Sequence, residues 1–331
     1  MKRAQRTVHR LLAAALVYAL ACPAFCAAAS QENNPVEQGY GYLDQGDNRK
    51  AVRAFRRADR DASGRSVEAL IGLATAYLHR QKFDDAGAAA RRAVDAAEDP
   101  ESRAAAYHLL GLALFSDGDA EVAELESAAR AFEAVAANGT PTDATRFSHA
   151  LVLTHLERWE EAFGTYRDLL DGDLDPDLDR SVRIKLCEGL LQRETSPGGG
   201  PVAMDAVSEK EARKLSAAMP WVQRPERLHT PQPYFGSKLA PGSRHVMIFK
   251  LLMDRYGCVR TVEPMKVDDS EMADISSAAL RTWVYRPSAI GDRSVASHMF
   301  VTVRAEWGAP TVKHLGVHCR TVGSSLRCES Q

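Results

Sequence analysis

Residues 276–292 read SSAALRTWVYRPSAIGD, and this stretch changes its character twice. The letters AAL at 278–280 favour a helix, whereas the letters WVY at 283–285 favour a strand. Pro287 then ends either element, because proline has no N–H to donate and restricts the residue before it. The stretch therefore predicts a helix that runs directly into a short strand and is closed by a turn.

The residues around this stretch alternate between strand and helix patterns. Residues 245–257 carry apolar side chains at alternate positions, which is typical of a strand, and a second strand is expected in 258–267 after a turn at Gly257. Asp268, Asp269 and Ser270 can cap a helix, and residues 271–283 have apolar residues at helical spacing. Residues 294–307 then predict a last strand that faces a core.

This order of elements resembles the C-terminal domain of the TonB family. The family shares a glycine turn, a helix ending in small residues, a Trp-x-Tyr-x-Pro strand, a further glycine and a final apolar strand. The matching positions here are Gly257, Ala279, Trp283, Tyr285, Pro287, Gly291, Val301 and Val303. The resemblance covers residues 225–310 and implies a small α+β domain, an antiparallel sheet with one helix. In the family, an extended segment of the partner is added to an open sheet edge. An unrelated small α+β domain is the alternative.

The first half of the chain, residues 36–192, repeats itself. Small and aromatic residues recur at steps of 3, 9, 4 and 3 in three sets: Gly39, Tyr42, Ala51, Phe55 and Ala58; Ala74, Tyr77, Ala86, Ala90 and Ala93; Ala150, Leu153, Ala162, Tyr166 and Leu169. This spacing resembles the tetratricopeptide (TPR) repeat, a helix–turn–helix unit of about 34 residues. The resemblance implies an all-α solenoid, and one more helix after the repeats is expected to shield the last of them.

A TPR-like array has a concave face formed by the first helix of each repeat. The residues expected there are Tyr40, Ile71, Leu78, His108, Leu112, Phe115, Phe147 and Leu151. An apolar face of this kind predicts a groove for an extended peptide or a helix of a partner protein. The alternative, that these residues pack against the protein's own C-terminal half, stays open.

The N-terminal residues read as a targeting signal. A basic start precedes the apolar run 11–22, and small residues follow at 27–29, so residues 1–29 are expected to be a secretory signal peptide. An uncleaved membrane anchor is the alternative. Cleavage removes four basic and no acidic residues, which takes the net charge from −2 to −6 and argues against nucleic acid as a partner.

Four cysteines remain after residue 29, and an even number in an exported chain suggests disulfides. Cys319 and Cys328 flank a turn-forming sequence and are expected to form a disulfide hairpin, whereas the pairing of Cys187 and Cys258 stays open. A metal site made of His314, His318 and these two hairpin cysteines is a minor alternative.

The sequence therefore predicts five segments: a signal peptide (1–29), TPR-like repeats (36–192), a linker with a short helix (193–224), a TonB-like domain (225–310) and a C-terminal extension (311–331). No motif of an enzyme is present, so we expect neither catalysis nor a cofactor or metal. The expected function is protein–protein interaction in the periplasm or envelope of a Gram-negative bacterium, linked to outer-membrane transport or assembly.

The alternative function is a TonB-like energy transducer that acts on outer-membrane transporters through an uncleaved N-terminal anchor. In the favoured hypothesis the partners are proteins, membrane contact after cleavage is at most peripheral, and a homodimer is left open. Residues 311–329 are expected to pair with the last strand and to cover the sheet edge that would otherwise bind a transporter.

Overall fold

The computed structural model of the 331-residue chain describes residues 34–115, 120–197, 222–235, 238–239, 242–290, 293–306, 311–313, 317–322 and 325–330. The predicted signal peptide and the predicted linker helix lie outside the described residues. The chain forms two compact units, one that ends at Thr165 and one that begins at Tyr166.

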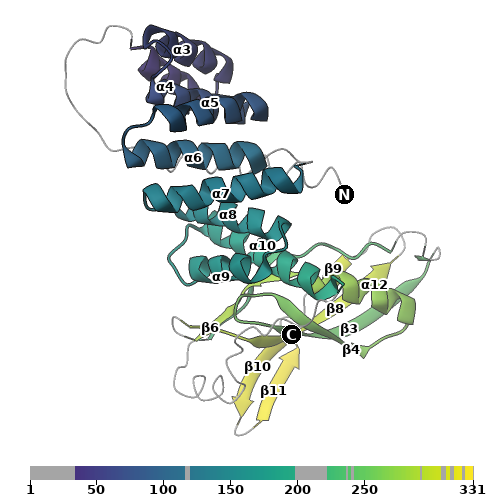
Figure 1. Cartoon of the computed structure of the whole chain (residues 1–331). Coiled ribbons are helices and arrows are strands. Elements are labelled where there is room, and N and C mark those ends of the chain that lie inside the picture. Colours follow the sequence, from purple (N-terminus) through teal and green to yellow (C-terminus); the bar gives the residue numbers. More distant parts are fainter. Residues whose placement is uncertain are drawn as a thin grey trace. The chain divides into compact units, whose positions relative to one another are not determined.

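The first unit consists of antiparallel helix pairs that follow one another along the chain (Figure 1). The helices are α2 (Pro35–Asp44), α3 (Asn48–Asp61), α4 (Val67–His79), α5 (Phe83–Ala96), α6 (Pro100–Phe115), α7 (Val122–Asn138), α8 (Asp143–His155) and the start of α9 (Trp159–Leu170). From α2 to α8, each helix packs against the next, and the first helices of successive pairs also contact each other: α2 with α4, α4 with α6, and α6 with α8. This packing makes the unit a TPR-like helical array.

Short polar side chains start most of these helices, as local sequence rules require. Asn34, Asp47, Ser66 and Thr142 each accept a hydrogen bond from a backbone N–H in the first turn of the helix that follows. Glu121 begins α7 with a capping box, in which its backbone N–H donates to the Glu124 carboxylate at 3.1 Å. The helix boundaries therefore follow from residues next to them in sequence.

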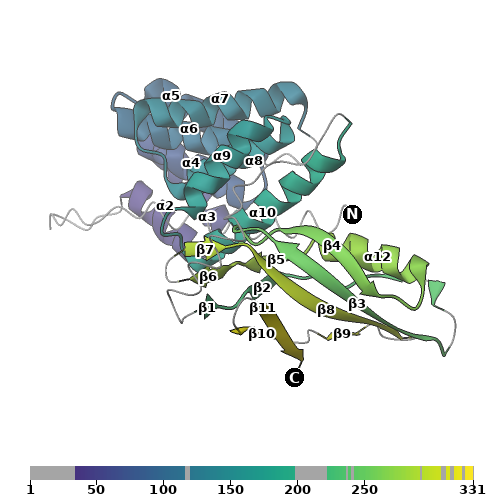
Figure 2. The same ribbon diagram turned by 90° about the horizontal axis from the view of Figure 1, so that it is seen from below.

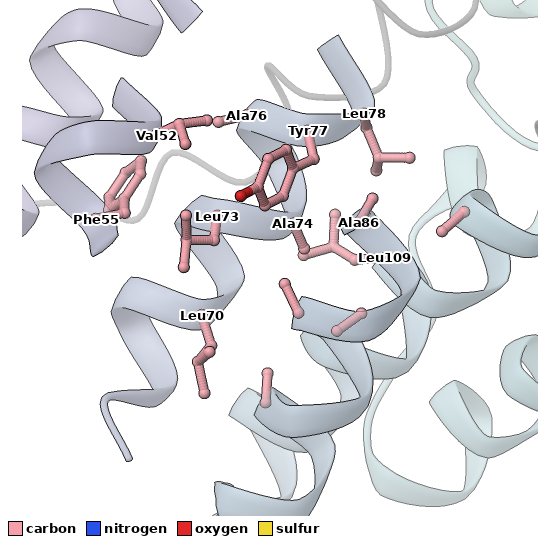
Figure 3. Close-up of a cluster of buried hydrophobic side chains, with 14 of the residues drawn as sticks. Val52, Phe55, Leu70, Leu73, Ala74, Ala76, Tyr77, Leu78, Ala86 and Leu109 are labelled. Atoms are coloured by element: carbon pink, nitrogen blue, oxygen red, sulfur yellow. The ribbon is translucent and has the colours of Figure 1, made fainter. Parts of the chain in front are cut away.

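The Phe55 ring lies in the buried hydrophobic cluster of this array (Figure 3), and glycines of the neighbouring first helices pack against it. The Phe55 ring is fully buried, and a Cβ atom added to Gly39 or Gly72 would lie 2.5 Å or 2.4 Å from it. Gly111 packs against Phe132 in the same way, since a Cβ atom added to Gly111 would lie 2.8 Å from the Phe132 ring. The repeated small residues therefore let a first helix approach the aromatic ring of a second helix.

We expect Gly72→Ala to destabilise the first unit by about 1–3 kcal/mol, because the new methyl group cannot fit beside the Phe55 ring. The matched control is Gly41→Ala in α2, where no heavy atom lies within 4 Å of the added Cβ. That change is expected to stabilise the helix by about 0.5–1 kcal/mol. Urea unfolding monitored by circular dichroism measures both. Equal effects of the two substitutions would contradict the proposed close packing.

The second unit begins within α9 and contains α10 (Pro176–Thr195), the C-terminal strands and α12 (Ser270–Arg281). Its main sheet has the order β4-β3-β8-β9, from β3 (Arg244–Met253), β4 (Val259–Lys266), β8 (Ser297–Glu306) and β9 (Thr311–Lys313). The neighbouring strands pair antiparallel, and α12 lies beside β4 (Figure 2).

Further short strands complete the unit. β5 (Val284–Arg286) pairs with β2 (Glu226–His229), and β1 (Val222–Gln223), β6 (Ser288–Ile290) and β7 (Arg293–Val295) form a three-stranded sheet. β10 (Val317–Val322) and β11 (Ser325–Ser330) pair only with each other among the described strands. The sequence did not predict β1, β2 and β6, because strands of two to four residues carry too little pattern. The single strand predicted over residues 294–307 is divided into β7 and β8.

Along β3, buried residues alternate with more exposed ones, so the sheet has a core face and an outer face. Met247, Phe249, Leu251 and Met253 of β3 are fully buried, as are the predicted core residues Val301 and Val303 of β8. On α12 the buried face is Met272, Ala273, Ser276 and Leu280. Of the residues at the end of this helix, Leu280 is therefore in the core, whereas the helical period leaves Ala278 exposed and Ala279 half-buried.

Two predicted boundaries also differ from the structure. We expected α10 to close the repeats, but it belongs to the compact unit that contains the sheet. Residues 311–329 were expected to pair along the last strand and to cover its edge. Only β9 does so, over residues 302–304 of β8, whereas β10 and β11 pair with each other among the described strands. The two differences have separate causes. The packing of α10 depends on segments distant in sequence, and the three residues of β9 carry too little pattern to be predicted as a strand.

Candidate interaction surfaces and the disulfide-linked junction

The residues predicted to line the concave face differ in exposure. Phe147 is completely buried, and Leu78, His108 and Leu151 are also buried in the first unit. A buried side chain offers no surface to a partner, so these four positions do not match the expected open groove. The reason is the packing of neighbouring helices: α4 contacts α2, α3, α5 and α6; α6 contacts α4, α5, α7 and α8; and α8 contacts α6 and α7.

The remaining four of these residues keep some surface. Tyr40 on α2 is 37% exposed, and Ile71 on α4, Leu112 on α6 and Phe115 on α6 are half-buried. Ile71 and Leu112 pack against one buried cluster, and Leu112 and Phe115 pack against the next. We call these four residues the first-helix row.

His108 is a structural residue of the helical core. Its Nδ1 lies 3.0 Å from the Thr145 hydroxyl on α8, and its ring contacts Phe132 edge-on. Burial lowers the pKa of His108 to about 4 from its ordinary value of 6.5. The imidazole is therefore neutral at pH 7.

This depressed pKa predicts acid sensitivity of the folded state. Unfolded chains take up the His108 proton near pH 6.5, whereas the folded protein takes it up only near pH 4. The contribution of His108 to stability is therefore constant above pH 6.5 and falls by up to about 3 kcal/mol between pH 6.5 and 4. The variant His108→Gln should lose less stability over this range, as measured by urea unfolding at pH 7, 5.5 and 4.5. Parallel pH curves for variant and wild type would contradict the prediction.

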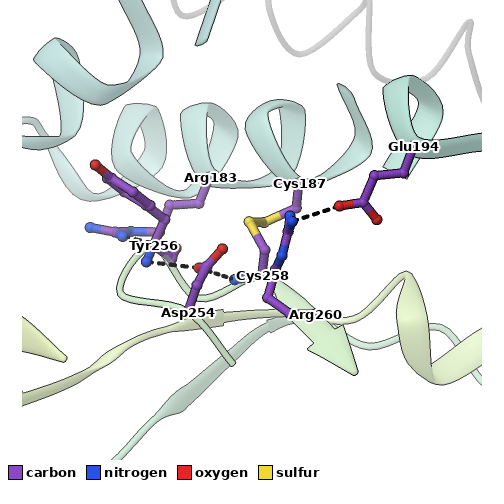
Figure 4. Close-up of a disulfide and its surroundings, with 7 residues drawn as sticks. All are labelled: Arg183, Cys187, Glu194, Asp254, Tyr256, Cys258 and Arg260. Carbon is purple, nitrogen blue, oxygen red and sulfur yellow. Dashed lines mark hydrogen bonds and ion pairs between the residues drawn. A yellow bond between two sulfur atoms is a disulfide. The ribbon is translucent and has the colours of Figure 1, made fainter. Parts of the chain in front are cut away.

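A covalent junction joins α10 to the turn between β3 and β4 (Figure 4). Cys187 of α10 and Cys258 of the turn form a disulfide with a Cα–Cα distance of 5.2 Å and a sequence separation of 71. Sequence reasoning left this pair open, because spacing along the chain says nothing about which distant cysteines meet. The only signal was the even number of cysteines.

Charged side chains reinforce the junction on both sides of the disulfide. Arg183 of α10 donates from Nη1 to the backbone carbonyl of Tyr256 at 3.1 Å and is held by Asp179, with Nη2 at 2.8 Å from Oδ1. Arg260 of β4 pairs with Glu194 of α10 at 2.5 Å. Arg183, Arg260 and Glu194 are largely shielded from water, so solvent and salt screen these pairs less than ordinary surface ion pairs.

Asp254 shapes the turn itself. Its Oδ1 accepts hydrogen bonds from the backbone N–H groups of Tyr256 at 2.9 Å and Cys258 at 3.0 Å. Burial raises the pKa of Asp254, and these two N–H donors oppose the rise. The side chain thereby presents Cys258 to α10, and the arrangement serves to position the disulfide.

The residues that carry the TonB resemblance occupy the core around this turn. Trp283 and Tyr285 are buried with their ring centroids 6.3 Å apart, and the Trp283 indole N–H donates to the Pro231 carbonyl at 2.8 Å. The Gly257 carbonyl accepts the Tyr285 N–H at 3.0 Å. Pro287 ends β5, as predicted, but β6 begins directly after it where a turn was expected; Gly291 lies outside the described residues.

The two edges of the main sheet differ in their suitability for strand addition. On β4, Pro264 lacks an N–H, a shift in register follows it, and Met265 is 54% exposed; Val267, just after the strand, is 39% exposed. On β8, β9 pairs with residues 302–304 only. Residues 297–301 have no partner strand on that side among the described strands.

Cys319 and Cys328 are opposite each other in the β10–β11 pairing. The predicted hairpin is thus present, and the disulfide between these cysteines stays a prediction. Among the described residues, no group of three or more His, Cys, Asp or Glu side chains could hold a metal ion. Within the same residues, no helix has the length and apolar character needed to cross a bilayer.

Comparison with known proteins gives structural likeness only. No protein-family model and no curated protein matches the chain. Among solved structures, a MamA protein is 21% identical over 47% of this chain and 79% of its own, with a TM-score of 0.40. The TPR protein TTC0263 of Thermus thermophilus is 18% identical over 56% of this chain and 96% of its own, also at 0.40. The assignment of the helical array rests on the helix contacts described above.

Proposed function

We propose that the protein is an exported cell-envelope protein whose helical array recognises a protein partner. The first-helix row carries this proposal, because it leaves apolar surface on three successive first helices where neighbouring side chains are buried. Repeat arrays use such continuous surfaces to bind peptides or helices of other proteins.

The compartment is part of the proposal and has its own support. Disulfides persist in oxidising compartments and are rare in the cytosol, and the Cys187–Cys258 bond fits the signal peptide expected at residues 1–29. Mass spectrometry of the protein isolated from cells tests export. A start near Ser30 supports it, and an intact N-terminus in the membrane fraction supports the anchored, TonB-like transducer instead.

The C-terminal unit would act as a second partner-binding module, similar to the TonB C-terminal domain in its order of elements. Its available edge would be residues 297–301 of β8, since β9 covers residues 302–304 and Pro264 interrupts the other edge. Binding of a partner strand there would be limited in length, which suits recognition better than transmission of force.

Recognition by the first-helix row is tested with one charged substitution and a matched control. Phe115→Glu places a charge within the row, whereas Val122→Glu changes a 66% exposed apolar residue on α7 outside it. After crosslinking in cells, the partner captured by wild type and Val122→Glu should fall at least about tenfold with Phe115→Glu. Thermal melts confirm that both variants are folded. Unchanged capture by a folded Phe115→Glu protein would refute the proposal.

A further inference from the structure

The exposed side of α3 is strongly basic. This helix of 14 residues contains six basic and two acidic side chains. Its buried face is apolar apart from Asp59, and all the basic residues lie on the exposed face: Arg49, Lys50, Arg53, Arg56, Arg57 and Arg60. A helix rises about 1.5 Å per residue, so Arg49 and Arg60 are separated by about 16 Å along the axis.

Few carboxylates neutralise this face. Asp47 pairs with Lys50 at 2.8 Å, and the exposed Asp61 lies 3.7 Å from Arg57. The buried Asp59 is directed to Arg92 of α5 at 2.7 Å. Arg49, Arg53 and Arg60 have no carboxylate within salt-bridge distance among the described residues.

The face is unusual for this protein, whose net charge is −2. The second helix of the next pair, α5, has acidic residues in its first turn, and α7 contains three glutamates against one arginine. A shallow depression of about 620 Å³ adjoins the N-terminal end of the basic face, and its lining includes two basic residues, Arg49 and Arg80, and one acidic residue, Asp47. The cations are therefore concentrated at α3 and not spread evenly.

We propose that this basic face of α3 binds the surface of a bilayer that contains anionic phospholipids. Guanidinium groups match phosphate oxygens in geometry, and five of the six cations are arginines. Each basic residue near an anionic membrane surface strengthens binding by a factor of about five. The contact would be peripheral, since none of the exposed large apolar side chains of the described residues lies on α3.

The absence of such side chains on α3 also favours a lipid surface over an acidic protein segment. The centres of stable protein interfaces are formed by apolar and aromatic anchors, with charges at the rim. The exposed α3 face offers charges alone, which suffice for attraction to a charged plane. The face would orient the helical array on the membrane.

Vesicle flotation tests this inference with the protein as purified from cells. Wild type should float with vesicles of phosphatidylcholine and phosphatidylglycerol at about 3:1 in about 50 mM NaCl, should not float with pure phosphatidylcholine, and should be released by about 500 mM NaCl. The triple variant Arg49→Gln/Arg53→Gln/Arg60→Gln should bind the anionic vesicles roughly 100-fold more weakly.

The matched control removes the same charge elsewhere in the first unit: Lys82→Gln/Arg91→Gln/Arg130→Gln, at three other exposed positions. It should bind as wild type does within about threefold, because only cations near the surface contribute. Equal flotation with both vesicle types, equal loss in both triple variants, or no loss in the α3 variant would each overturn the proposal. Fluorescence anisotropy with a short polyglutamate peptide tests the alternative ligand, an acidic protein segment. Tight binding of that peptide without vesicle binding would assign the face to an acidic protein segment instead.

Discussion

Replacing Gly257 by alanine is expected to unfold the sheet-containing unit or to destabilise it by about 4 kcal/mol or more. Gly257 has a φ of +93°, and an added Cβ would lie 1.7 Å from the carbonyl oxygen of Tyr285. That oxygen belongs to the backbone of a fully buried residue, so it cannot move aside as a flexible side chain could. Relief of the clash would separate the turn from β5 and break the hydrogen bond from Tyr285 N–H to the Gly257 carbonyl.

Gly242→Ala is the matched control for this prediction. Gly242 also has a positive φ, +78°, but no heavy atom lies within 4 Å of its added Cβ. This substitution isolates the backbone penalty, which is about 1–2 kcal/mol. Near-UV circular dichroism, which reports the packing of the aromatic side chains, Trp283 among them, and urea unfolding compare the two variants. Similar losses in the free energy of unfolding for both variants would show that the close approach of Gly257 to the Tyr285 carbonyl does not determine stability.

Removing the Cys187–Cys258 disulfide is expected to cost about 4 kcal/mol, the second large effect. The bond closes a loop with a sequence separation of 71, and the entropy lost by the unfolded chain on such closure gives this magnitude. The variant Cys187→Ala/Cys258→Ala should therefore unfold at lower urea concentration than wild type under oxidising conditions. A reducing agent should lower the stability of the wild type toward that of the variant.

The pair Cys319→Ala/Cys328→Ala is the internal comparison. These positions are nine residues apart and lie opposite each other in a hairpin, so a bond between them closes a much shorter loop. Its removal should therefore cost less. Peptide mapping of the unreduced protein decides the pairing directly. Ready alkylation of Cys187 and Cys258 in the native, unreduced protein would refute the junction, and alkylation of Cys319 and Cys328 would refute the hairpin disulfide.

The helical half was predictable because its signals are local. The recurring steps from Gly39 to Ala58 set the register of a helix pair, and the residues that cap the helices are adjacent to the helices they start. The order of strands and helix around residues 276–292 was predictable for the same reason, since Gly257 and Pro287 end elements within their own neighbourhood. The exposure of the residues expected on the concave face was less predictable. His108 and Phe147 have the spacing of surface residues, but neighbouring helices bury them.

The sequence by itself thus determined where the main helices and strands form and which residues interrupt them. Only the tertiary structure decided which segments meet. Cys187 meets Cys258, α10 joins the unit that contains the sheet, and β9 extends that sheet. The physical reason is the range of the interactions. Backbone propensity and capping act within a few residues, whereas a disulfide, a strand pairing or the burial of a helix face depends on partners dozens of residues away, which no local pattern specifies.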